Sequence, residues 1–201
     1  MTTSTAQHTD PRPLLHDAVD WVRGLVDGVA VERYGDPTPC GEFDVRTLLA
    51  HLVGVMGRAH AAGTGTPPLE RPAVVTGIAD GDLAATVRQA IDDLDPLWHN
   101  DAMLDEMIDV PWGRVPGRGV VWGYLNETLV HGWDLAVATG QDCEADPAAA
   151  EAALATFTGF LPAEPRGGPV PFGPVVEPAA GAGPTERLAN WSGHTRPDQG
   201  R

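Results

Sequence analysis

The sequence predicts an all-α fold: a four-helix bundle with a long connection before its last helix and a Pro/Gly-rich C-terminal extension. Apolar residues recur at helical spacing in four long segments, prolines and glycines crowd the connection before the fourth, and Pro and Gly recur again beyond residue 160. Amphipathic helices that share one core commonly form such bundles. A mixed α/β fold is the alternative.

The first two helices are indicated by apolar stripes with clear beginnings. The first follows Pro11 and Pro13, and its apolar residues recur every three or four positions as far as Val29. After a break rich in glycine and proline, Asp44 is placed to cap a second helix, whose stripe runs to Met56.

The third and fourth helices are separated by a segment that cannot be helical. A loop at 63–72 precedes a third helical pattern at about 82–98. Residues 107–119 hold several prolines and glycines, which remove donors or raise the cost of ordering the backbone. The fourth helix is expected at 120–139 and is almost wholly apolar, ending at Gly140.

The C-terminal part is expected to add smaller pieces to these four helices. Asp146 is placed to cap, and Pro147 to open, an alanine-rich helix that ends near Phe160. One short helical turn is expected within the tail, near residues 186–191.

Composition favours one cytoplasmic domain. Residues 1–10 are polar and expected to be disordered, whereas 11–201 are long enough for a single core. A net charge of −15 repels phosphate backbones and anionic membranes, and neither a signal segment nor a bilayer-length apolar run is present. We expect no nucleic-acid or membrane partner, and a homodimer through exposed helix faces is one possible assembly.

The fourth helix carries the candidate chemistry. At roughly 100° per residue, Glu127, His131 and Asp134 fall within an arc of about 60° on a helix that is otherwise apolar. A buried carboxylate and imidazole cost several kcal/mol unless they are paired, and a cation between them offsets this cost. Taken alone, Glu127 and His131 fit a solvated helical ion pair as well.

His51 is the candidate third ligand. It lies at the edge of the second apolar stripe, where it can face the interior, although in isolation it also fits a core histidine. Glu-x-x-x-His places two donors on adjacent helical turns, which suits zinc, with nickel as the alternative. The residues alone thus leave open a divalent-metal site formed by His51, Glu127 and His131, with an ion pair and a core histidine as the alternatives.

Two blocks resemble the DinB-like metalloprotein superfamily. They are Thr38-Pro-Cys-Gly-Glu-Phe-Asp-Val-Arg-Thr-Leu-Leu-Ala-His51 and Glu127-Thr-Leu-Val-His131-Gly-Trp-Asp134. They are most similar to the branch of mycothiol-dependent maleylpyruvate isomerase, and the resemblance covers most of the chain. It implies a helical bundle that holds a divalent ion, usually zinc, through His51, Glu127 and His131. Glu127 in place of a third histidine favours the mycothiol branch.

The resemblance also implies an activity. A metal site with an open position would lower the pKa of a small thiol, with mycothiol as co-substrate, for attack on a small electrophile by an S-transferase or isomerase. A non-catalytic metal- or ligand-binding domain and a metal-dependent hydrolase with Asp134 as general base remain alternatives. The isomerase of this branch has a further C-terminal domain that helps form its active site, whereas a Pro/Gly-rich tail stands here, so its substrate is not assigned.

The remaining conspicuous side chains are mostly expected to have structural or surface roles. Asp134 is expected either to orient a metal ligand or to bond the backbone, and Trp133 to pack in the core. Cys40 is expected to be structural, and Cys143 an exposed free thiol. Four further histidines lack a donor at ligand spacing and are expected at the surface: His16, His60, His99 and His194.

Overall fold

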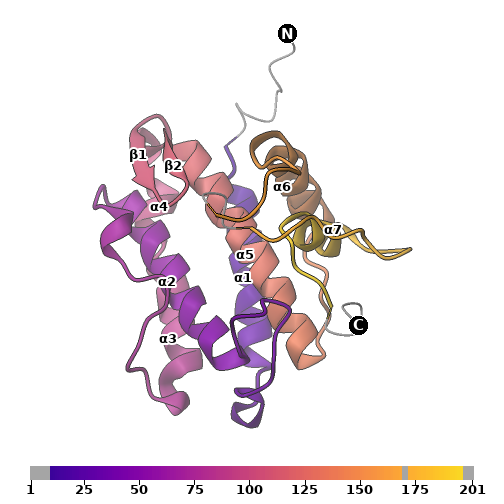
Figure 1. Cartoon of the computed structure of the whole chain (residues 1–201). Helices are drawn as coiled ribbons and strands as arrows, with labels where there is room; N and C mark the ends of the chain where they lie inside the picture. The colour runs from indigo at the N-terminus through magenta and orange to yellow at the C-terminus, as the bar shows by residue number, and fades with distance from the viewer. Residues whose placement is uncertain (1–9, 169–171, 197–201) are drawn as a thin grey trace.

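The computed structural model describes residues 10–168 and 172–196 and is mostly helical, as the sequence predicts (Figure 1). Of the N-terminal segment predicted to be disordered, only Asp10 falls within the described residues. In the described part of the chain, no helix combines the length and the apolar character needed to cross a bilayer.

Four helices enclose most of the core: α1 (Arg12–Asp27), α2 (Val45–Gly63), α3 (Asp80–Asp92) and α5 (Gly117–Thr139). Helices α1 and α2 each pack against both α3 and α5. Nearly all of α5 is buried, because most of its side chains are apolar or small and α1, α2 and the C-terminal helices all pack against it. Figure 1 shows α5 running through the middle of the molecule, with α2 on one side and the C-terminal helices on the other.

The predicted helix ends have the expected local chemistry. The Asp44 side chain accepts a hydrogen bond from the Thr47 N–H at 2.7 Å and so caps α2. Gly140 ends α5 with φ = 70°, a left-handed conformation that glycine adopts without steric cost. Asp146 caps α6 (Pro147–Phe160) by accepting from two backbone N–H groups.

Two segments differ from the sequence prediction. The third predicted helix is interrupted after α3, and a separate short helix, α4 (Asp95–His99), has Pro96 in its first turn, where proline is tolerated. The connection before α5 is a hairpin of two antiparallel strands, β1 (Met107–Val110) and β2 (Gly113–Pro116), joined by a tight turn in which Gly113 has φ = 135°. The fold is therefore not purely α.

Three short 3₁₀ turns, at Val31–Arg33, Pro68–Glu70 and Asp101–Leu104, complete the connections. Helix α5 begins at Gly117, three residues before the predicted start, and a Cβ there would clash with the Met103 carbonyl. The hairpin turn and this close approach depend on glycine, which the composition of the segment indicated without specifying the strands.

The last described helix, α7 (Pro184–Trp191), packs on α6 and on α5. Its first turn is held by the Glu144 carboxylate, which accepts from the Thr185 N–H at 3.0 Å and the Glu186 N–H at 3.3 Å. This contact ties the C-terminal extension to the segment that follows α5. The His194 side chain, three residues beyond α7, therefore reaches Asp134 on α5.

Candidate functional site

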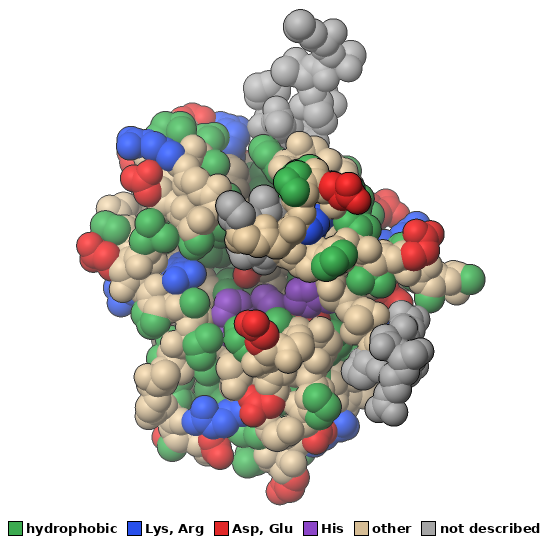
Figure 2. All heavy atoms as spheres, in the orientation of Figure 1, with side chains coloured by type: hydrophobic (Ala, Val, Ile, Leu, Met, Phe, Trp, Pro, Cys, Tyr) green, Lys and Arg blue, Asp and Glu red, His purple; other side chains and the backbone are tan. Residues whose placement is uncertain are grey.

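Histidine side chains gather in a hollow near the middle of one face of the molecule (Figure 2). One ring nitrogen of His51 on α2, one of His131 on α5 and a carboxylate oxygen of Glu127 on α5 all lie within 4.8 Å of one another. The Nε2 atoms of His51 and His131 are each 3.6 Å from Glu127 Oε2. The structure thus brings together all three residues that the sequence analysis proposed as metal ligands.

A neighbouring loop orients His51. Its Nδ1 lies 2.8 Å from the Ala73 carbonyl oxygen, and because a carbonyl can only accept, Nδ1 is the donor. The loop itself is held against α2 by a bond from the Val75 N–H to the Ala50 carbonyl at 3.2 Å. A Cβ on Gly54 would clash with Ala73, so glycine permits this close approach. The His51 Nε2 atom consequently faces Glu127.

That Nε2 atom is buried and has no hydrogen-bond partner among the residues that the structure describes. The 3.6 Å separations from Glu127 exceed the usual range of N–H···O hydrogen bonds. A buried polar atom without a partner costs free energy, so this nitrogen is aimed at a position that something else could fill.

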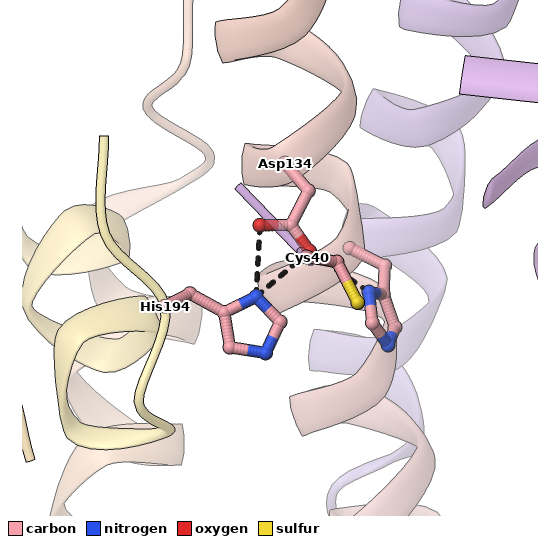
Figure 3. Close-up of side chains that lie close together, drawn as sticks. Cys40, Asp134 and His194 are labelled. Carbon is pink, nitrogen blue, oxygen red and sulfur yellow. Dashed lines mark hydrogen bonds and ion pairs between the residues drawn. The ribbon is translucent and has the colours of Figure 1, made fainter. Parts of the chain in front are cut away.

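Asp134 orients His131 from the other side of the ring. Its side chain is fully buried, and its Oδ2 lies 2.9 Å from His131 Nδ1. His194 Nδ1 lies 2.9 Å from both carboxylate oxygens (Figure 3). Burial would raise the pKa of Asp134, but the nearby charge of His194 and the hydrogen bonds of both imidazoles lower it. Asp134 therefore contacts two imidazole side chains, one on α5 and one in the C-terminal extension.

The site concentrates charge in a buried position. Burial would raise the pKa of Glu127, but His131 and His51 lower it well below its usual range. Burial would lower the pKa of His131, but its bond to Asp134 and its pairing with Glu127 raise it to about 10. The carboxylates of Glu127 and Asp134 thus flank the protonated His131, and a bound cation could take the place of its proton.

His194 and Cys40 lie closer to the site than the sequence analysis predicted. The prediction that His194 is a surface residue is wrong, since only 17% of its side chain is exposed and it contacts Asp134. The Cys40 sulfur lies within 4.8 Å of donor atoms on His131, Asp134 and His194. Only a weak signal marked them in the sequence: Cys40 belongs to the same block as His51, and His194 follows a helix-ending glycine.

The Cys40 thiol stays protonated. Burial raises its pKa to about 12, and the carboxylates of Asp134 and Glu127 add to the increase. Trp133 is fully buried, as predicted. Cys143 is half-buried instead of exposed, because Arg196 Nη2 lies 3.2 Å from its sulfur.

The helical fold and the facing histidines and glutamate agree with the DinB-like class that the sequence resembles. Residues 15–136 match the family described as the mycothiol maleylpyruvate isomerase N-terminal domain. The chain belongs to this family.

Two uncharacterized proteins of Mycobacterium tuberculosis, one from strain CDC 1551 / Oshkosh and one from strain H37Rv, are each 30% identical over 187 residues. The alignment covers 92% of this chain and 98% of each relative. The crystal structure of the mycothiol-dependent maleylpyruvate isomerase is similar in fold, with a TM-score of 0.52 and 17% identity. That match covers 66% of this chain and 63% of the solved chain, so this chain spans less than two thirds of its length.

Proposed function

We propose that this protein binds a divalent metal ion through His51, Glu127 and His131 and uses it to activate a small thiol, mycothiol being the leading candidate. The observation that carries the proposal is the buried His51 Nε2 atom, which has no hydrogen-bond partner in the described part of the chain and faces Glu127. Both Zn²⁺ and Ni²⁺ accept imidazole nitrogen and carboxylate oxygen as ligands. We propose Zn²⁺ as the ion, with Ni²⁺ as the alternative.

The donor separations fit such an ion. Two donors about 2.0–2.1 Å from a tetrahedral zinc ion stand roughly 3.3–3.4 Å apart. The two histidine nitrogens are 3.6 Å from the Glu127 oxygen, so shifts of a few tenths of an ångström suffice. The same separations are too long for strong hydrogen bonds, which makes three ligands a better account of the arrangement than an ion pair.

The chain's own residues prepare the site. A divalent ion supplies Lewis acidity, which lowers the pKa of a thiol bound at its open position. The Ala73 carbonyl and the Asp134 carboxylate each accept from an Nδ1–H, so that the Nε2 atoms of His51 and His131 face Glu127. Glu127 is the only charged member of the proposed ligand set, so a divalent ion and its three ligands would together carry one positive charge, which suits an anionic ligand.

The family supports a reaction class. We propose an S-transferase or isomerase in which a thiol adds to a small electrophile, and the family description, which names a mycothiol maleylpyruvate isomerase, supports this proposal. The hydrolase alternative required Asp134 as general base. Its carboxylate is fully buried and accepts from two imidazoles, an arrangement that holds side chains in place rather than one that receives a proton from water.

Metal content and thiol binding test the proposal together. Wild-type protein and the His51→Ala and His131→Ala variants are loaded with Zn²⁺, dialysed and assayed by elemental analysis, then titrated calorimetrically with mycothiol. His99→Ala is the matched control, because its side chain is 74% exposed and far along the chain from the site. We expect about one equivalent of zinc and thiol binding in wild type and control, and loss of both in the two site variants.

Zinc retained by both site variants, or absent from the wild type, would overturn the metal assignment. Zinc binding without any mycothiol binding would instead favour a non-catalytic metal-binding domain. Mycothiol binding that persists in metal-free protein would place the thiol site elsewhere.

A further inference from the structure

His194 belongs to a chain of three side chains that ends at a proposed metal ligand. His194 Nδ1 lies 2.9 Å from both oxygens of Asp134, and Asp134 Oδ2 lies 2.9 Å from His131 Nδ1. An ionised carboxylate can only accept, so both imidazoles donate through Nδ1. Figure 3 shows the other nitrogen of His194 on the far side of its ring from Asp134.

The backbone directs His194 towards α5. Gly193 ends the helical segment with φ = 94°, and its N–H donates to the Asn190 carbonyl at 3.0 Å. The His194 N–H donates to the Ala189 carbonyl at 2.9 Å, and the Asn190 side-chain amide donates to the His194 carbonyl at 3.0 Å. Gly173 packs so closely on Gly193 that a Cβ at position 193 would lie 2.7 Å from it. The turn is therefore fixed by close packing.

Contacts on both sides of His194 hold this turn against the rest of the protein. Before it, the Glu144 carboxylate accepts from the first N–H groups of α7. After it, Arg196 forms an ion pair with Glu186 at 2.8 Å, and its guanidinium lies 5.5 Å from the centre of the Trp133 ring. Trp133 immediately precedes Asp134 on α5, so the segment is anchored next to the residue that His194 contacts.

We propose that His194 is a positioning residue of the metal site: by donating to Asp134 it fixes the carboxylate that holds His131 with Nε2 towards Glu127. This inference rests on the proposed function. A carboxylate with a single imidazole donor can rotate about its side-chain bond, whereas donors from two different elements fix its plane and orientation. The C-terminal extension is thus part of the metal site although it supplies no ligand.

Two substitutions separate the hydrogen bond from the bulk of the side chain. His194→Ala removes the donor. His194→Asn keeps one, because the asparagine amide nitrogen occupies nearly the position of Nδ1. We measure Zn²⁺ affinity by competition with a chromophoric chelator, and the visible absorption spectrum of the Co²⁺-loaded protein. We expect His194→Ala to bind Zn²⁺ about 10–100-fold more weakly with an altered Co²⁺ spectrum, and His194→Asn to restore both to within about threefold.

The outcomes are distinct. If wild-type protein binds Zn²⁺ and His194→Ala matches it in affinity and spectrum, this inference is overturned while the proposed function stands. Equal weakness of the alanine and asparagine variants would overturn the donor role. Failure of wild-type protein to bind Zn²⁺ would remove the proposed function, and this inference with it. Far-UV circular dichroism shows whether each variant folds. If His194→Ala does not fold, the Zn²⁺ affinity and Co²⁺ spectrum of His194→Asn decide the test, and a loss of both in the folded variant would overturn the donor role.

Discussion

Replacing Asp134 by asparagine removes one charge from the centre of the site while keeping the shape of the side chain. In the wild type, the carboxylate accepts hydrogen bonds from His131 and His194 at 2.9 Å, and it is fully buried. An asparagine amide has a single oxygen, and His194 Nδ1 lies 2.9 Å from both carboxylate oxygens, so the NH₂ group would oppose the His194 N–H in either orientation. The substitution therefore sets two donors against each other at His194 and leaves His131 with a neutral bond at best.

The magnitude follows from these two bonds. A hydrogen bond to a charged group contributes about 1.5–3 kcal/mol, and a neutral one about 1 kcal/mol. Losing one charged bond and neutralising the other lowers the free energy of unfolding of the metal-free Asp134→Asn protein by about 2–4 kcal/mol. This is a large share of the roughly 5–15 kcal/mol typical of a domain. Zinc affinity should fall about 10–100-fold, because His131 loses the partner that orients it.

Urea unfolding of metal-free protein at pH 7, analysed by linear extrapolation, measures the first effect, and chelator competition measures the second. Asp109→Asn is the matched control, since its side chain is 66% exposed and its ion pair with Arg114 is long at 3.9 Å. The reasoning is refuted if Asp134→Asn costs less than about 0.5 kcal/mol, as a surface substitution would, and also leaves zinc affinity unchanged.

Four further predictions concern protonation and packing. Because the pKa of His131 is raised from 6.5 to about 10, an incoming ion must displace its proton. The apparent Kd for zinc should therefore fall about tenfold per pH unit from pH 6 to 8. A Kd that does not change with pH in competition titrations would contradict this. The raised pKa also means that protonated His131 stabilises the metal-free protein. This contribution to the free energy of unfolding is fully present below pH 6.5 and is lost as the pH rises through about 10. Gly132→Ala should lower the free energy of unfolding by about 1–3 kcal/mol, because its methyl group would clash with the Trp21 ring. Gly24→Ala should raise it by about 0.5–1 kcal/mol, because this position faces open space within α1. Urea unfolding should therefore show changes of opposite sign for the two variants. With a pKa of about 12, Cys40 should react with iodoacetamide at pH 8 on the order of 10³-fold more slowly than free cysteine. Peptide mass spectrometry measures this rate. A rate within tenfold of that of free cysteine would contradict the burial of this thiol.

The segment that matches the family contains some of the residues tested by these experiments but not all of them. The match over residues 15–136 covers the segment that contains His51, Glu127 and His131, whereas His194 lies beyond it. The Zn²⁺ and His194 measurements therefore address separate parts of the chain. The first asks whether the matched segment binds metal, and the second asks whether the C-terminal extension contributes to that binding.

The sequence by itself determined the features that depend on near neighbours. A helix cap such as Asp44 acts on an N–H three residues away, and the left-handed stop at Gly140 depends on its own φ, so both helix ends were predictable. The i, i+4 spacing of Glu127 and His131 likewise fixes a shared helix face. Resemblance to a known family added His51, which no local rule connects to α5.

Only the tertiary structure decided which distant groups meet. His194 lies 60 residues from Asp134 in the chain, and in the sequence only the preceding glycine, a weak signal, distinguishes it from an exposed histidine such as His99. Its position results from the packing of α7 on α5 and the turn at Gly193. The state of Cys40 was hidden for the same reason, because burial and nearby carboxylates, rather than its place before α2, set its pKa. Hydrogen bonding and desolvation act through space, and only the folded chain specifies which atoms are close enough to feel them.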